Sequence, residues 1–167
     1  VNDTEGRLGA AAYKLSHHCA DGRGVYTFCM CPGGVVVGAA SEEGGVVTNG
    51  MSYFARDGEN AHSALLVDVR PEDCGADDPD APLAGIDFQE KLEKSAYELG
   101  GGGYIAPAQT LADFLKGKDP DASCTPVDPT YRPGVRYADL TKCLPAFVTA
   151  AMREALPRMA SKLKGFD

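Results

Sequence analysis

The first half of the chain alternates apolar and polar positions in short runs, a pattern that favours β-strands. Residues 25–31 (VYTFCMC) form the strongest of these runs, and residues 32–34 (PGG) end it. Successive side chains of a strand point to opposite faces of its sheet. A regular strand would therefore have two distinct faces, with Val25, Thr27, Cys29 and Cys31 on one and Tyr26, Phe28 and Met30 on the other.

Two further patterns extend this sheet. Residues 35–40 and 46–51 flank a Gly-containing loop at 41–45, which predicts a β-hairpin. Residues 64–69 (ALLVDV) predict a fourth strand, which is mostly buried and is stopped by Pro71.

Helical spacing is weak over residues 7–20 and clear after residue 85. Asp87 is the expected N-cap of a helix, because Glu90 follows three residues later, and Gly100 is the expected stop. One apolar stripe would run along this helix, formed by Phe88, Leu92, Ala96 and Leu99.

The last third of the chain predicts two more helices. Pro107 would open the first, which ends at Gly117, and a Pro-rich connector follows over residues 119–133. The second helix is expected from about residue 141 to residue 164, and Pro157 would kink or break it.

Strands followed by helices indicate an α+β fold. We expect an antiparallel sheet, built from N-terminal strands and a hairpin, with the C-terminal helices packed on it. A length of 167 residues suits one domain spanning 1–167. The chain contains neither a G-x-G-x-x-G nor a G-x-x-x-x-G-K-[ST] loop, so we expect no complete Rossmann fold and no nucleotide-phosphate cradle.

Composition and charge narrow the function classes. A net charge of −8 argues against a nucleic-acid partner, which requires a basic face, and the acidic stretch at 72–80 is expected to be a solvated loop. The apolar runs are too short for a transmembrane helix, and the polar residues 1–5 do not resemble a signal peptide. We therefore expect a cytoplasmic protein whose six cysteines are free thiols.

Cys29 and Cys31 are the candidate catalytic residues, and three interpretations of them remain open. They can be small, packed side chains, because free cysteine is among the most buried residue types. They can bind a metal, although no C-x-x-C or H-x-x-x-H partner supports a zinc site and we expect none. They can also face a substrate or flavin as reactive thiols.

A polar set follows the hairpin and supplies candidate substrate- or flavin-facing residues. Arg56 can hold a carboxylate or phosphate through two parallel hydrogen bonds. Asn49 and Asn60 lie near strong turn signals, so a purely structural role is open for them. His62 can donate a proton or serve only in packing.

Six segments carry a resemblance to the bacterial FAD-dependent (NAD-utilising) dehydrogenases. The first, at 24–34, is the most specific, and the likeness covers nearly the whole chain. One position departs from the family, which usually has Asn-Ser-Ala where this chain has His62-Ser63-Ala64. The six segments are 24–34 (GVYTFCMCPGG), 48–52 (TNGMS), 56–61 (RDGENA), 82–86 (PLAGI), 101–109 (GGGYIAPAQ) and 129–135 (PTYRPGV).

The resemblance implies that the chain is one part of a longer flavoprotein oxidoreductase. It would be an inserted middle domain on the substrate side of the flavin, with FAD bound by the rest of the parent protein and none by this part. Its partners would be that FAD-binding remainder and a small-molecule substrate. A stand-alone module that binds a small ligand or metal through the Cys29–Cys31 strand is the alternative, and a thiol oxidoreductase acting alone is a third interpretation.

Overall fold

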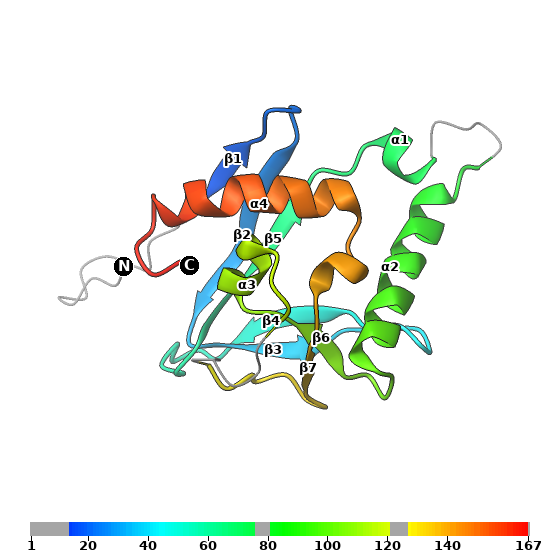
Figure 1. Cartoon of the computed structure of the whole chain (residues 1–167). Helices are drawn as coiled ribbons and strands as arrows, with labels where there is room; N and C mark the ends of the chain where they lie inside the picture. The colour runs from blue at the N-terminus through cyan, green and yellow to red at the C-terminus, as the bar shows by residue number, and fades with distance from the viewer. Residues whose placement is uncertain (1–13, 76–80, 121–126, 167) are drawn as a thin grey trace.

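The computed structural model describes residues 14–75, 81–120 and 127–166. Its first layer is a three-stranded antiparallel sheet with the strand order β1-β2-β5. The strands are β1 (Ser16–His18), β2 (Gly24–Pro32) and β5 (Ala61–Val67). The long C-terminal helix α4 (Ala146–Ala160) crosses one face of this sheet (Figure 1).

The core between α4 and the sheet follows from the alternation of β2. Val25 of β2 is fully buried. It packs against Ala155 and Met159, two fully buried residues on the inward side of α4. Leu65 and Val67 on β5 pack against the same cluster, because they pair with Thr27 and Val25 across the ladder. The predicted inward positions of β2 are thus confirmed up to Thr27.

A second, smaller layer lies beside this sheet. It contains the predicted hairpin, β3 (Gly34–Gly38) with β4 (Thr48–Ser52), and a parallel pair, β6 (Ala106–Ala108) with β7 (Val135–Tyr137). The core of this layer is formed by Val46, Ala106 and Tyr131, with Ala96 and Tyr97 of helix α2 packed against it. The α+β class is confirmed, although the strands of the described residues form three small sheets rather than one.

The remaining helices are α1 (Pro71–Cys74), α2 (Ala84–Gly100), α3 (Leu111–Lys116) and the 3₁₀ turn η2 (Leu140–Lys142). The predicted apolar stripe of α2 is half-buried. Gly101, at φ 91°, caps this helix, one residue after the predicted stop. Gly117 ends α3 in the same left-handed conformation, as predicted.

One predicted element and the starts of two predicted helices were wrong. Residues 16–18 form a strand because the backbone of β1 pairs with β2, and residues 1–13 of the proposed N-terminal helix lie outside the described residues. Helix α2 starts at Ala84, so Asp87 lies in its first turn and is not the N-cap. Pro107 lies in strand β6, whose parallel partner β7 follows just after the predicted Pro-rich connector, and α3 begins at Leu111 behind the N-cap Thr110.

Two more expectations concern α4 and α1. Pro157 does not end α4, which continues to Ala160. Within the acidic stretch 72–80, Asp73 is 9% exposed and binds Arg23 of the β1–β2 turn through two short hydrogen bonds of 2.6 and 2.7 Å. This paired carboxylate is therefore not solvated, while residues 76–80 lie outside the described part of the chain.

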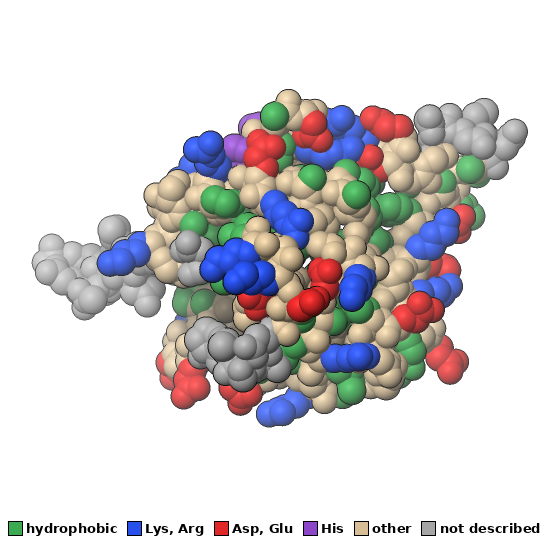
Figure 2. Space-filling view, viewed as in Figure 1, with side chains coloured by type: hydrophobic (Ala, Val, Ile, Leu, Met, Phe, Trp, Pro, Cys, Tyr) green, Lys and Arg blue, Asp and Glu red, His purple; other side chains and the backbone are tan. Residues whose placement is uncertain are grey.

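Across the described residues, no helix is long and apolar enough to cross a membrane. The five described cysteines form no disulfide bond, and Cys124 lies outside the described segments. Acidic and basic side chains are interspersed over the face seen in Figure 2, so the described residues there form no continuous basic stripe.

Candidate functional site

Strand β2 contains a bulge at the Cys-Met-Cys segment. Phe28 pairs with Ala64 and Cys31 pairs with His62, so three steps along β2 match two along β5. Cys29 accommodates the extra residue with a positive φ of 48°. Because Ala64 and His62 share one face of β5, Cys31 lies on the face of Phe28, which corrects the regular alternation predicted for this strand.

The turn after β2 is held by a close backbone contact. A Cβ atom at Gly33, whose φ is +65°, would overlap the carbonyl group of Arg56, and one at Gly58 would lie 2.8 Å from the Gly33 oxygen. Arg56 itself has a φ of 53°. The loop after β4 is thereby seated directly on the Pro-Gly-Gly turn, and glycine is required at position 33.

His62 is held between the two strands of the hairpin. A Cβ atom at Gly34 or at Gly50 would overlap the imidazole ring. The Nε2 atom lies 3.1 Å from the carbonyl oxygen of Met51, which can only accept, so Nε2 carries the proton and donates this bond. Gly34 and Gly50 therefore leave the space that the His62 ring occupies, and a larger residue at either position would collide with it.

Cys31 and His62 line one cavity, which we call the β2 cavity. It has a volume of about 370 Å³ and lies between the bulged end of β2, the start of β5 and the C-terminal segment. Its wall is mostly apolar, formed by Met30, Cys31, Pro32, Ala61, His62, Ser63, Leu65, Leu156, Leu163, Gly165 and Phe166.

A second cavity, the hairpin cavity, has a volume of about 260 Å³ and shares Ala61 and His62 with the first. The side-chain amide of Asn60 borders it and donates to the carbonyl oxygen of Asp128 at 3.2 Å. The full lining is Gly34, Val36, Thr48, Asn60, Ala61, His62, Ala106, Pro107, Ala108, Val127, Pro129, Thr130, Tyr131 and Val135.

The structure brings three of the six candidate residues to these cavities and leaves three outside them. Cys31, Asn60 and His62 line a cavity, whereas Cys29 is exposed and lines neither. Asn49 is also exposed, and its side-chain oxygen accepts a bond of 2.8 Å from the amide of Gly50, which fits the structural interpretation. Arg56 is exposed and contributes its backbone to the contact with Gly33.

Sequence reasoning missed Thr130 and Tyr131 as parts of the site, although both lie in one of the segments that carry the resemblance. The hydroxyl of Thr130 accepts a bond of 2.9 Å from the amide of Val36, which joins the connector to the hairpin. The Tyr131 hydroxyl donates to the carbonyl oxygen of Tyr104 at 2.8 Å, and burial raises the pKa of Tyr131. Tyr131 is therefore a neutral, hydrogen-bonded part of the cavity wall.

The described residues bring one group of metal-ligand type together, away from both cavities. His17, Cys19 and Glu154 place one ligand atom each within 4.8 Å of the others. The carboxylate already accepts bonds from the Ala20 amide at 3.0 Å and from His17 Nε2 at 3.2 Å. Burial and the nearby Glu154 charge raise the pKa of Cys19, so its thiol stays protonated, and it donates to the carbonyl oxygen of Ala151 at 3.6 Å. Cys29 and Cys31 are part of no such group among the described residues.

A bound dinucleotide does not fit the described part of this chain. Such a group needs a parallel strand, a Gly-rich turn and a helix whose N-terminus receives the pyrophosphate. The one parallel pair in the described segments is β6–β7, with three residues in each strand. The turn from β6 to α3 is Gln109–Thr110 and has no glycine, and the carboxylate of Asp113 occupies the first turn of α3, bound to Thr110.

Comparison with known proteins places these features in a family. The sequence profile of the family described as "FAD-dependent protein, C-terminal domain-like" matches residues 1–167. An uncharacterized protein of Clostridium beijerinckii is 46% identical over 166 residues. That match covers 99% of this chain and 30% of the other, so the chain spans less than a third of its relative's length.

Proposed function

Because this chain belongs to the family of FAD-dependent protein C-terminal domains, we propose that it is the substrate-side part of a larger flavoprotein oxidoreductase, an NAD-utilising dehydrogenase. The rest of the parent protein binds FAD, since the described residues do not fit a dinucleotide. The proposal includes the place of the chain as an inserted middle domain and a cytoplasmic parent. The match to only 30% of a longer relative supports a larger parent.

The observation that carries the proposal is the convergence of the resembling segments on two adjoining cavities. The segments at 24–34 and 56–61 both contribute to the β2 cavity. Those at 101–109 and 129–135 meet the hairpin segment at 48–52 around the hairpin cavity. Segments far apart in the sequence therefore come together at one site, where Ala61 and His62 line both cavities.

The chemistry of this place suits binding and orientation of a small substrate. Ligand cavities are mostly apolar with a few placed polar groups, and here Cys31 and His62 are the titratable side chains of the β2 cavity. His62 presents a ring fixed by the hydrogen bond to Met51. In a flavoenzyme the cofactor supplies the redox chemistry, and residues such as these position the substrate.

The full-length parent protein tests the proposal. We expect it to purify with bound flavin and to lose the visible flavin absorbance when NADH or NADPH is added without oxygen. We expect His62→Gln to keep the flavin content and to reduce turnover, because the ring and its bond to Met51 are lost. His18→Gln, at an exposed position of β1 that borders neither cavity, is the matched control. A parent without flavin would overturn the proposal.

A further inference from the structure

The end of β4 and the loop that follows it expose three large apolar side chains within four residues. Met51 is 56% exposed, Tyr53 is 71% exposed, and Phe54 is 105% exposed. Scattered single apolar residues are normal on a protein surface, whereas a large exposed apolar patch rimmed by polar residues is typical of an interaction site. The residues that follow in the sequence, Arg56, Asp57, Glu59 and Asn60, are polar.

This exposure is built into the structure around it. The carbonyl oxygen of Met51 accepts a bond from His62, and the amide of Arg56 donates to the carbonyl oxygen of Tyr53 at 3.1 Å. Gly33 and Gly58 then fix the far end of the loop through direct backbone contact. Both ends of the apolar segment are thus tied down, so the side chains are held outward by their backbone.

The anchors of the segment are also the walls of the site. His62, which holds Met51, lines both cavities, and Pro32, beside the Gly33 contact, lines the β2 cavity. Any body that covers residues 51–54 therefore lies next to the β2 and hairpin cavities.

We propose that residues 51–54 are the docking surface for the FAD-binding remainder of the parent protein. The occupant follows from length, because about 70% of the relative's chain lies outside the matched region. Contacts between domains of one chain bury about 600–1,500 Å², and the buried centre of an interface is more apolar than its rim. The proposal rests on the proposed function and extends it, since docking here closes the two cavities against the part that holds the flavin.

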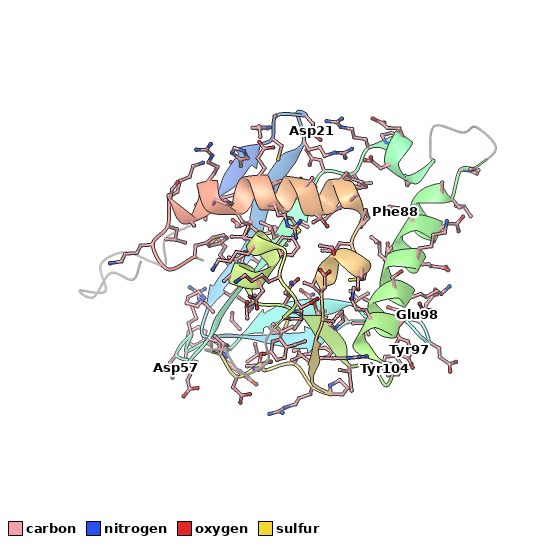
Figure 3. The ribbon with its side chains drawn as sticks, viewed as in Figure 1. Asp21, Asp57, Phe88, Tyr97, Glu98 and Tyr104 are labelled. Atoms are coloured by element: carbon pink, nitrogen blue, oxygen red, sulfur yellow. The ribbon has the colours of Figure 1, made fainter. Side chains whose placement is uncertain are left out.

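Hydroxyl-radical footprinting of the full-length parent and of this 167-residue chain tests the proposal, because methionine, tyrosine and phenylalanine side chains are readily oxidised. We expect oxidation of Met51, Tyr53 and Phe54 to be several-fold lower in the parent. Tyr104, which is 39% exposed and lies across the molecule from the Asp57 loop (Figure 3), is the internal control and should be oxidised equally in both. Equal oxidation of residues 51–54 in the two proteins would overturn the proposal.

Substitution gives an independent readout. Phe54→Ser should lower the melting temperature of the parent by about 2 °C and leave that of the 167-residue chain unchanged, because the ring is buried only in the parent. Ile86→Ser, at a 55% exposed position on α2, should change neither protein. If oxidation of residues 51–54 in the 167-residue chain instead falls as its concentration rises, a second copy is the occupant and the proposal is wrong.

Failure of the docking surface can be distinguished from failure of the flavoprotein function. A parent that carries flavin but leaves residues 51–54 reactive would refute the docking surface and keep the flavoprotein function. A parent without flavin that nevertheless protects residues 51–54 would refute the function and show that the surface docks another kind of domain, which also overturns this inference.

Discussion

Cys29 and Cys31 are separated by one residue in the sequence, and the structure gives them different surroundings. Their pattern predicted one shared face, because a regular strand repeats every second residue. The bulge at Cys29 adds one residue to β2, so Cys31 lies on the face of Phe28. Cys31 also lines the β2 cavity, whereas Cys29 does not. A bulge of this kind depends on pairing with β5, which no local pattern in residues 25–31 reveals.

This difference predicts unequal effects of two nearly isosteric substitutions in the parent enzyme. Cys31→Ser should lower kcat/KM at least about tenfold, because the thiol borders the cavity, whereas Cys29→Ser should leave it nearly unchanged. Steady-state kinetics at equal flavin content measures both. Each variant should lose at most about 1–2 kcal/mol of stability, which separates packing from chemistry. Small, equal losses of turnover would reduce the motif to a structural role.

The ion pair of Arg23 and Asp73 predicts a pH dependence of stability. The hydrogen bond from the Arg23 guanidinium holds the pKa of Asp73 below its ordinary value of 3.8. The unfolded chain therefore binds the proton more readily than the folded chain, and the stabilisation is present above the unfolded pKa and disappears as the pH falls through the folded one. The melting temperature of Asp73→Asn should lie below that of the original chain at neutral pH.

The difference in melting temperature between the two proteins should stay constant down to about pH 4. It should close at lower pH, where the Asp73 carboxyl is protonated and is then neutral like asparagine. Thermal unfolding of the 167-residue chain at a series of pH values measures it. Glu72→Gln, at the exposed neighbouring position of α1, should show no such closing gap. A gap that persists unchanged below pH 3 would assign the effect to shape rather than charge.

At the scale of elements, the sequence predicted those whose signal is local. Strand β2, the β3–β4 hairpin and the apolar stripe of α2 follow from periodicity and turn residues within each segment. Strands β1, β6 and β7 have three residues each and exist through pairing with distant partners, so their own residues carry too little pattern. The start of α2 was missed because Leu83 caps it without a side-chain hydrogen bond.

The contact between the hairpin and β5 predicts a stability effect at a glycine. Gly50→Ala should destabilise the chain by about 1–3 kcal/mol, because the added methyl group overlaps the His62 ring and forces it from its bond with Met51. Chemical unfolding measures this loss. Gly85→Ala is the matched control, since nothing lies within 4 Å of its added Cβ atom. As a helical position it should be neutral or slightly stabilising.

The combination with His62→Ala provides a further check. Removing the ring removes the overlap, so Gly50→Ala should cost much less in a His62→Ala background, which a double-mutant cycle detects. Additive losses would show that the methyl group acts on the hairpin itself.

At the scale of the whole molecule, the two layers are joined through the corner where His62 lies. One layer is the β1-β2-β5 sheet under α4, and the other gathers the hairpin, β6, β7 and α2 (Figure 1). The sequence predicted the class and the candidate segments. It could not predict that Cys31 and His62 would share a cavity while Cys29, Asn49 and Arg56 would not, since that depends on the bulge and on glycine contacts between layers.

This architecture predicts that the 167-residue chain does not bind FAD by itself, because the described residues provide no phosphate-binding turn. The purified chain should be colourless, and titration into FAD should produce no saturable quenching of flavin fluorescence. The full-length parent, prepared in the same way, is the positive control. A yellow, stoichiometric complex of the short chain would contradict the division of labour proposed for the parent.

His62 lines both cavities, and its ring fills the space between Gly34 and Gly50. Asparagine, which the resemblance gives for relatives at this place, is shorter than histidine and would leave the gap between Gly34 and Gly50 partly open. In such a relative the two chambers would merge into one passage running from β2 to the hairpin. The length of molecule that the protein admits would then be decided by this one side chain. Xenon under pressure in crystals of His62→Asn would mark a continuous channel, and two separate sites in the original chain.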